Sequence, residues 1–225
     1  MLLQADNISK TFFRNTGSAN YFYAVSPLSM EIRPGTVTVL TGRSGSGKTT
    51  LLNMLCGILQ PTEGRVLMDR TDLYSLDDAA LSRFRNEHIG VIPQARSAVD
   101  TLTAEENILL PARLYGKDAP AEKARRWMED FEIAHLAGVF PRELSGGELR
   151  RMAIIRAVIR DPDLLFADEP TGDLDDENTH RVLSALHDLA HGENKAVFIV
   201  THENDAEKYA DRVFRMDRGE VFPLA

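Results

Sequence analysis

The most constraining feature of the sequence is a glycine-rich loop that joins a predicted strand to a predicted helix. The β-branched run Val37–Thr41 predicts a buried strand. Apolar residues recur at helical spacing from Leu51 to Leu59, so the loop is expected to open directly into a helix. This order of elements predicts an α/β fold with a phosphate-binding loop. The predicted phosphate contacts are Gly42, Arg43, Ser44, Gly45, Ser46, Gly47, Lys48, Thr49 and Thr50.

The residue types in this loop suit a bound triphosphate. Glycines allow backbone N–H groups to curl around phosphate oxygens without a clash from a Cβ atom. The following helix presents the positive end of its dipole to the same phosphates. We expect Lys48 to reach the β- and γ-phosphates and the Thr49 hydroxyl to bind Mg²⁺. The loop therefore predicts a nucleoside triphosphate and Mg²⁺ as ligands.

Short apolar runs elsewhere predict the rest of the sheet structure. Three of them suit strands of a sheet that is covered on both faces, and these lie at residues 89–92, 164–167 and 197–201. Other segments alternate more strongly and predict a small N-terminal antiparallel sheet. Its strands are expected around residues 2–13, 28–32 and 64–68, with a polar loop at residues 15–20. A further strand is expected close to the C-terminus.

Between about residues 95 and 145 the pattern changes to helices. Thr103–Glu106 has capping-box spacing before an apolar run. Pro120 opens a second periodic stretch, with Trp127 on its apolar side. We expect this block to be an inserted α-helical subdomain. Because the glycine-rich motifs spread along nearly the whole chain, residues 1–225 are expected to form one domain.

Composition excludes several classes of protein. The chain has 225 residues, of which 43% are hydrophobic, as in ordinary globular proteins. We find no apolar run near the ~18 residues of a membrane-spanning helix and no secretory signal. A formal net charge of −8 argues against a broad nucleic-acid footprint, so no nucleic-acid partner is expected. The single cysteine, Cys56, excludes an internal disulfide and is expected to be buried.

Two adjacent acids follow the apolar run at residues 164–167. Asp168 ends this predicted strand and is expected to reach the magnesium shell through water, as the acid of a P-loop ATPase does. Glu169 would point at the water that attacks the γ-phosphate, and it is our candidate general base. A solvated strand end is the alternative for such a pair, but the apolar strand and the specific pattern that follows disfavour it.

A second glycine-rich turn, Leu144–Glu148, lies about a hundred residues after the first and precedes an apolar-periodic helix. A glycine turn at a helix N-terminus is an anion site by geometry. Together the two turns resemble the motifs of the ATP-binding-cassette (ABC) family, in which the Ser-Gly-Gly turn of one subunit closes over ATP held by another. The resemblance implies ATP contacts from Ser145, Gly146, Gly147 and Glu148. Glu148 stands where the family more often has glutamine.

Other segments resemble family motifs in the family's order. Gln94 resembles the glutamine that binds Mg²⁺ and senses the γ-phosphate, and His202 resembles the histidine that contacts this phosphate. Pro170–Asp175 resembles the loop that contacts the opposite subunit, with Asp175 as its last residue. Phe12 best matches the aromatic residue that stacks on adenine. A competing aromatic cluster consists of Tyr21, Phe22 and Tyr23.

Two segments, Arg83–Gly90 and Ala167–Asp175, are most similar to the lipoprotein-release, macrolide-efflux and cell-division ATPases. This resemblance implies a homodimer at the cytoplasmic face of the cell membrane that drives a separate transmembrane permease. At Ala95–Asp100 the chain departs from the group's aromatic-rich stretch, beside the expected groove for the membrane partner. The sequence leaves the cargo, the direction of transport and the permease open.

Two other functions are considered. A soluble cassette ATPase acting on nucleic acid or ribosomes usually carries coiled coils, a second cassette or basic extensions, none of which the sequence shows. Salt-dependent binding of DNA or RNA would favour it. A P-loop kinase of small molecules would explain Lys48 and Thr49, but it leaves Ser145–Gly147 and His202 without a role. Phosphoryl transfer to a metabolite would favour the kinase.

Overall fold

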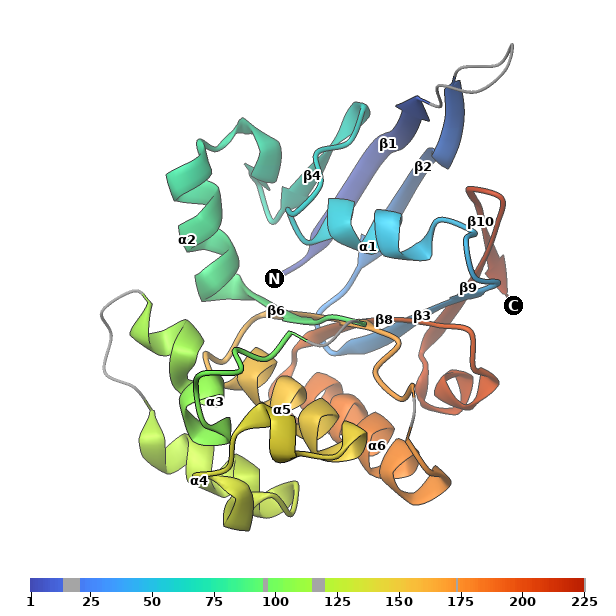
Figure 1. Cartoon of the computed structure of the whole chain (residues 1–225). Helices are drawn as coiled ribbons and strands as arrows, with labels where there is room; N and C mark the ends of the chain where they lie inside the picture. The colour runs from blue at the N-terminus through green and yellow to red at the C-terminus, as the bar shows by residue number, and fades with distance from the viewer. Residues whose placement is uncertain (14–20, 95–96, 115–119, 173, 225) are drawn as a thin grey trace.

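The protein has two sheets and a helical subdomain, with the larger sheet in the middle (Figure 1). A computed structural model describes residues 1–13, 21–94, 97–114, 120–172 and 174–224. Its strands are β1 (Leu3–Phe13), β2 (Tyr21–Ile32), β3 (Thr36–Gly42), β4 (Glu63–Met68), β5 (Thr71–Asp72), β6 (Ile89–Ile92), β7 (Leu164–Asp168), β8 (Ala196–Thr201), β9 (Arg212–Asp217) and β10 (Glu220–Leu224). Its α-helices are α1 (Lys48–Leu55), α2 (Asp78–His88), α3 (Ala104–Arg113), α4 (Ala121–Asp130), α5 (Gly146–Val158) and α6 (Asp176–Glu193). Short 3₁₀ helices lie at Leu73–Ser75, Ala134–Leu136, Pro141–Glu143 and Asn204–Tyr209.

The central sheet has the strand order β10-β9-β3-β8-β7-β6. The five strands from β9 to β6 run parallel, and only β10 is antiparallel to its neighbour. Parallel neighbours place the carboxyl ends of β3, β7 and β8 at one edge of the sheet. This edge therefore receives the glycine loop after β3, the two acids at the end of β7 and the histidine after β8.

The second sheet is antiparallel, with the order β2-β1-β4-β5. Helix α1 lies between the two sheets and contacts strands of both (Figure 1). One apolar core fills this space and includes Leu40, Leu51 and Phe198. Cys56 belongs to the same core and is fully buried, as expected, which raises the pKa of its thiol to about 12.

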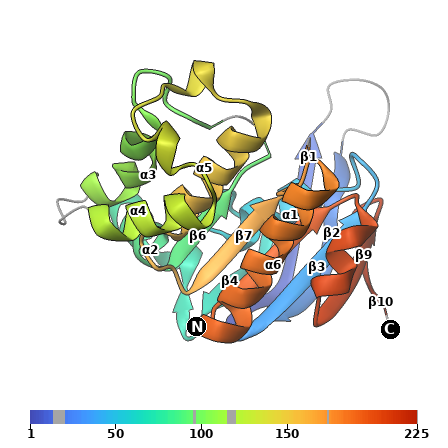
Figure 2. The ribbon, with the colours of Figure 1, turned by 90° about the horizontal axis from the view of Figure 1, so that it is seen from below.

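The other face of the central sheet is covered by helices. Figure 2 shows α6 lying along the strands, with α3, α4 and α5 gathered to one side. Successive residues of β8 pack on opposite faces of the sheet. Val197 and Ile199 belong to the core under the helices, whereas Phe198 belongs to the core around α1. The mixed α/β fold with an antiparallel subdomain and a helical insertion confirms the predicted fold class.

The first helix is shorter than its sequence pattern predicts. Helix α1 ends at Leu55, because Gly57 adopts a left-handed φ of +75° that interrupts helical geometry. Ile58, expected on the apolar face, is instead 55% exposed. Helix α2 was not expected from periodicity. The predicted polar loop at residues 15–20 lies outside the described residues.

Candidate functional site

The glycine loop after β3 is built around close backbone contacts. Gly47 has a φ of +111°, and a Cβ atom at this position would lie 2.1 Å from the Ala24 carbonyl oxygen. The buried Lys48 ammonium donates hydrogen bonds to the carbonyl oxygens of Gly42 (2.7 Å) and Arg43 (3.1 Å). Burial lowers the pKa of Lys48, and the charges of Glu169 and Asp168 oppose this effect. The loop thus holds a cation inside a turn of backbone.

The N-terminus of α1 is open to an anion. Helix α1, which the structure describes in full, has no side-chain cap at Gly47 and no acidic residue in its first turn. The first N–H groups of a helix lack intrahelical partners and carry a partial positive charge. At Gly45, a Cβ atom would meet none of the described atoms within 4 Å. The loop and helix therefore have both the dipole and the room for phosphate groups.

A magnesium ion fits between α1 and β7. The Thr49 hydroxyl donates a 2.9 Å hydrogen bond to Asp168 Oδ2. The other carboxylate oxygen, Oδ1, is buried and has no hydrogen-bond partner among the described residues. Burial is the main cause that raises the pKa of Asp168. Hydroxyl and carboxylate oxygens are ligands that Mg²⁺ prefers, so these groups, with Gln94 from the lining of the same cleft, would hold it.

Glu169 is fixed by donors from the end of β8. Its Oε2 accepts hydrogen bonds from the Thr201 hydroxyl (3.0 Å) and the His202 backbone N–H (3.3 Å), and it lies 2.9 Å from His202 Nδ1. Its own backbone N–H binds the Val200 carbonyl oxygen, and its φ of +50° is unusual for a non-glycine residue. The hydrogen bond that Glu169 accepts from the exposed His202 ring raises the pKa of this ring. A buried carboxylate is therefore held in one orientation.

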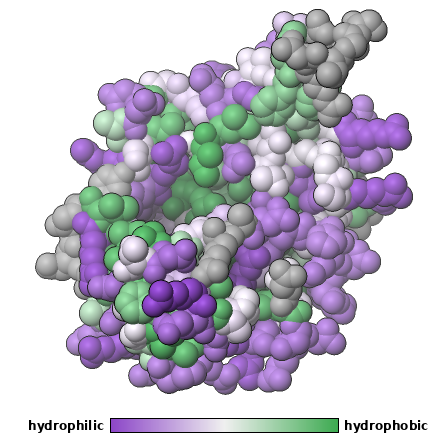
Figure 3. All heavy atoms as spheres, viewed as in Figure 1, coloured by the Kyte–Doolittle hydropathy of each residue, from purple (hydrophilic) through white to green (hydrophobic). Residues whose placement is uncertain are grey.

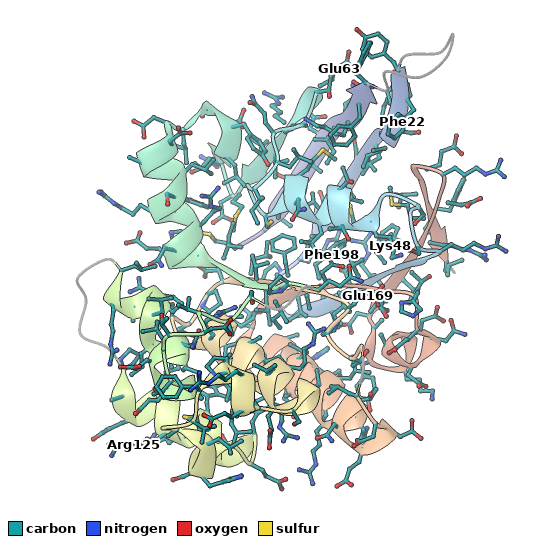
Figure 4. All side chains as sticks on the ribbon, viewed as in Figure 1. Phe22, Lys48, Glu63, Arg125, Glu169 and Phe198 are labelled. Atoms are coloured by element: carbon teal, nitrogen blue, oxygen red, sulfur yellow. The ribbon has the colours of Figure 1, made fainter. Side chains whose placement is uncertain are left out.

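These groups line a cleft of about 990 Å³ at the carboxyl edge of the central sheet. Figure 4 shows Lys48 and Glu169 at this end of the sheet, with Arg125 far away in the helical subdomain. Phe12, Phe22 and Tyr23 line the cleft as well, and the rings of Phe12 and Phe22 are 6.1 Å apart. Both aromatic groups considered from the sequence thus contribute to its wall, although Tyr21 is outside it.

The predicted site residues divide between two places. The described lining of the cleft includes Gly42–Thr50, Gln94, Glu169 and His202, and Asp168 joins it through Thr49. The second glycine turn, Ser145–Glu148, lies outside that lining. Gly146 instead lines a smaller cleft of about 150 Å³ that also includes Gln94. Asp175 caps the N-terminus of α6, and Asn178 binds both of its carboxylate oxygens.

Three arginines on α5 have contacts that the sequence reasoning missed. Arg150 donates to the carbonyl oxygens of Pro93 (2.9 Å) and Gln94 (3.4 Å), and Arg156 donates to the Ser97 carbonyl oxygen (2.7 Å). Arg151 donates to the Asn178 side chain, which holds Asp175. The arginine cluster itself was visible in the sequence, but it predicted solvated faces and contacts between subunits. These bonds tie α5 to the segment after β6 and to the start of α6.

Comparisons with known proteins agree with this geometry. Residues 25–172 match a family model described as ABC transporter. An uncharacterized ABC transporter ATP-binding protein of Mycobacterium bovis is 39% identical over 89% of this chain. This chain covers only 62% of that relative's length. The lipoprotein-releasing system ATP-binding protein LolD of Syntrophotalea carbinolica is 36% identical, over 98% of this chain and 96% of its own length.

Solved structures of ABC transporter cassettes have the same fold as this chain. A dimeric structure of MJ0796, a bacterial ABC transporter cassette, superposes with a TM-score of 0.91 at 30% identity, over 99% of both chains. A second dimeric structure of that cassette, in a post-hydrolysis state with ADP and Pi, has a TM-score of 0.90 at 29% identity and the same coverage. The chain therefore belongs to the ABC transporter family, as one of its ATP-binding proteins.

Proposed function

We propose that this chain is the ATP-hydrolysing subunit of a bacterial ABC transporter or mechanotransmission complex. Two copies pair head to tail around two Mg-ATP, and hydrolysis lets them separate. A separate membrane permease carries this motion across the membrane, so the chain works at the cytoplasmic face as a peripheral subunit.

One observation carries the proposal: the two glycine turns of a single chain belong to different clefts. Lys48 lines the large cleft, whereas Ser145 lies outside its described lining and is exposed. A second anion site that cannot reach the phosphates within its own chain can reach those held by another copy. The MJ0796 cassette is dimeric in both of its structures, which supports this arrangement.

The residues around the cleft divide the work of hydrolysis. Lys48 and the N-terminus of α1 bind the phosphates and stabilise their charge. Thr49, Asp168 and Gln94 would hold Mg²⁺, which neutralises charge on the phosphoryl oxygens when bound. Glu169, oriented by Thr201 and His202, positions the attacking water and accepts its proton. His202 holds this carboxylate and, in the closed dimer, reaches the γ-phosphate.

ATP closes the dimer because it binds the two states unequally. The γ-phosphate contacts Ser145 and Gly147 of the other copy only when the two protomers are together. A ligand shifts an equilibrium by its differential affinity for the two states. Loss of the γ-phosphate removes these contacts, and the protomers part.

The contacts of α5 provide a path from this motion to a permease. Arg150 and Arg156 bind the chain on either side of residues 95–96. A shift of α5 would therefore move this segment, which is next to the expected groove for the membrane partner.

Ile58 and Val99 are exposed apolar residues suited to a protein partner. On the face in Figure 3, hydrophobic residues gather in the hollow between the upper part of the molecule and the helical subdomain. Among the described helices, none is long and apolar enough to cross a membrane.

The Glu169→Gln variant tests the proposal. Glutamine keeps the size and hydrogen bonds of the side chain but cannot accept the proton, so ATP binding and closure persist while hydrolysis fails. Size-exclusion chromatography with Mg-ATP is expected to show a dimer for this variant and mostly monomer for the wild type. Glu129→Gln is the control, because Glu129 is exposed on α4, outside the described lining of the cleft.

The control is expected to turn over ATP like the wild type and to stay monomeric. A Glu169→Gln variant that binds Mg-ATP but remains a monomer would contradict the head-to-tail dimer. The permease is tested separately by purification from the native membrane, where lasting failure to recover a membrane protein would count against a transporter subunit.

A further inference from the structure

The N-terminus of α5 has a carboxylate in its first turn, whereas the N-terminus of α1 has none. Ser145 caps α5, and Glu148 occupies the third position of the helix. Glu148 Oε2 accepts hydrogen bonds from both the Ser145 backbone N–H (2.7 Å) and the Ser145 hydroxyl (2.8 Å). Helix α1, described throughout, has neither a side-chain cap nor an acid in its first turn. Of the two predicted phosphate sites, the N-terminus of α1 is thus open, whereas the N-terminus of α5 is occupied by the carboxylate of Glu148.

Glu148 is charged at neutral pH. The two hydrogen bonds from Ser145 are the main causes that lower the pKa of its carboxyl. The carboxylate also lies in the first turn of the helix, where a negative charge offsets the positive end of the dipole. In a single protomer, the hydrogen-bond donors of Ser145 in the second glycine turn are therefore already bound to the carboxylate of Glu148.

Closure of the dimer requires the Ser145 hydroxyl for a different contact. In the proposed function, the Ser145 hydroxyl and the N-terminus of α5 face the γ-phosphate of the other copy. A hydroxyl has one hydrogen to donate, so Ser145 cannot give it to Glu148 and to a phosphate oxygen together. When the phosphate takes it, a carboxylate is left close to a highly charged anion.

We propose that Glu148 is a built-in competitor of the γ-phosphate, which holds the Ser145 turn in the open protomer and weakens the ATP-bound dimer. This inference rests on the proposed function and adds a regulatory residue to it. Glu148 acts through Ser145 and is a positioning residue. Its effect is to make the closed state easier to leave, so that the two protomers do not remain locked together before hydrolysis.

The Glu148→Gln variant separates charge from capping. Glutamine also completes a capping box with serine, so α5 keeps its cap while the negative charge is removed. We combine it with Glu169→Gln, so that hydrolysis does not deplete the closed state, and measure the dimer dissociation constant in Mg-ATP by analytical ultracentrifugation. The double variant is expected to dimerise about tenfold more tightly than Glu169→Gln alone, because hydrogen bonds to a charged group are about twice as strong as neutral ones. ATP affinity of the monomer should not change.

Glu143→Gln is the matched control. Glu143 lies five residues earlier on the same subdomain, and its carboxylate accepts the Phe140 backbone N–H at 3.3 Å. The change removes the same charge and keeps an acceptor for a backbone N–H, but it leaves Ser145 untouched. The control should dimerise like its Glu169→Gln parent. The gain from Glu148→Gln should also shrink between about 0.05 M and about 0.5 M salt, because ions screen exposed charges, whereas a packing effect would not.

The outcomes distinguish this inference from the function on which it rests. If Glu169→Gln dimerises with Mg-ATP but Glu148→Gln adds no affinity, Glu148 does not compete and the inference is overturned. An equal gain from Glu143→Gln would also overturn it, because general charge reduction would then be the cause. If Glu169→Gln binds Mg-ATP without dimerising, the proposed function fails and the inference fails with it.

Discussion

Thr49 and Asp168 meet across the space between α1 and β7, where the Thr49 hydroxyl donates a 2.9 Å hydrogen bond to Asp168 Oδ2. The second oxygen of Asp168 is buried without a partner among the described groups. A buried polar atom that is left unpaired costs free energy. We infer that this cost is offset when a magnesium ion with its water reaches the carboxylate.

The Asp168→Asn variant is therefore expected to be more stable than the wild type but much less active. Asparagine keeps an acceptor for Thr49 but removes a buried charge, so the unfolding free energy without ligand should rise. ATP hydrolysis should fall by at least about a hundredfold, because metal binding contributes several kcal/mol to the transition state. Denaturant unfolding and steady-state ATPase assays measure the two effects. Lower stability together with full magnesium-dependent activity would contradict the assignment.

The stability gain should depend on pH in a defined direction. Burial raises the folded-state pKa of Asp168 above its ordinary value, so the charged form is the destabilising one. The destabilisation is present above the raised pKa and is lost as the pH falls through it. The difference in unfolding free energy between Asp168→Asn and the wild type should therefore shrink toward acid pH. A difference that grew toward acid pH would contradict burial as the cause.

Gly47→Ala is expected to disrupt the phosphate loop. Alanine at a φ of +111° is strained, and its Cβ would lie 2.1 Å from the Ala24 carbonyl oxygen. We expect a loss of about 1–3 kcal/mol in unfolding free energy together with loss of ATP binding. Gly192→Ala in α6 is the control, because none of the described atoms lies within 4 Å of its Cβ position. Alanine should stabilise that helix by up to about 1 kcal/mol, and equal effects at both sites would contradict the packing explanation.

The His202 ring should titrate above the ordinary pKa of histidine, 6.5, because Glu169 accepts its hydrogen bond. A raised folded pKa means that this contact contributes fully below the unfolded pKa and is lost as the pH rises through the folded value. NMR titration is expected to show a lower His202 pKa in Glu169→Gln. His191 provides an internal control, because its raised pKa comes from His187 and Asp211 and should not change. An unchanged His202 pKa would contradict the contact.

Local sequence patterns predicted three strands of the central sheet, because the information that specifies them lies within a few residues. The runs at residues 89–92, 164–167 and 197–201 all lie within strands of the central sheet. The end of α1 was missed because Leu51–Leu59 has helical periodicity, and a single glycine backbone angle at Gly57 overrides it. The capping box at Thr103 was predicted, and both of its hydrogen bonds are present.

Contacts between distant segments were beyond the sequence. Glu169 meets Thr201 and His202 because β7 and β8 pair in parallel, with Asp168 opposite Val200. No local pattern sets that register. The bonds from Arg150 and Arg156 to the segment after β6 likewise depend on how α5 packs against β6. The motifs predict which residues carry the chemistry, and the tertiary structure shows which of these residues contact one another.

Cross-linking between two chains tests the head-to-tail arrangement. Ser44 and Ser145 are both exposed, so Ser44→Cys and Ser145→Cys are placed on separate chains that also carry Cys56→Ala and Glu169→Gln. With a short bismaleimide, the mixed chains are expected to form a covalent heterodimer in Mg-ATP but not without nucleotide. Pairing Ser145→Cys with Ser184→Cys on α6 should give no such product. A cross-link that forms within one dilute chain carrying both Ser44→Cys and Ser145→Cys, without an ATP-dependent product between chains, would contradict the head-to-tail dimer.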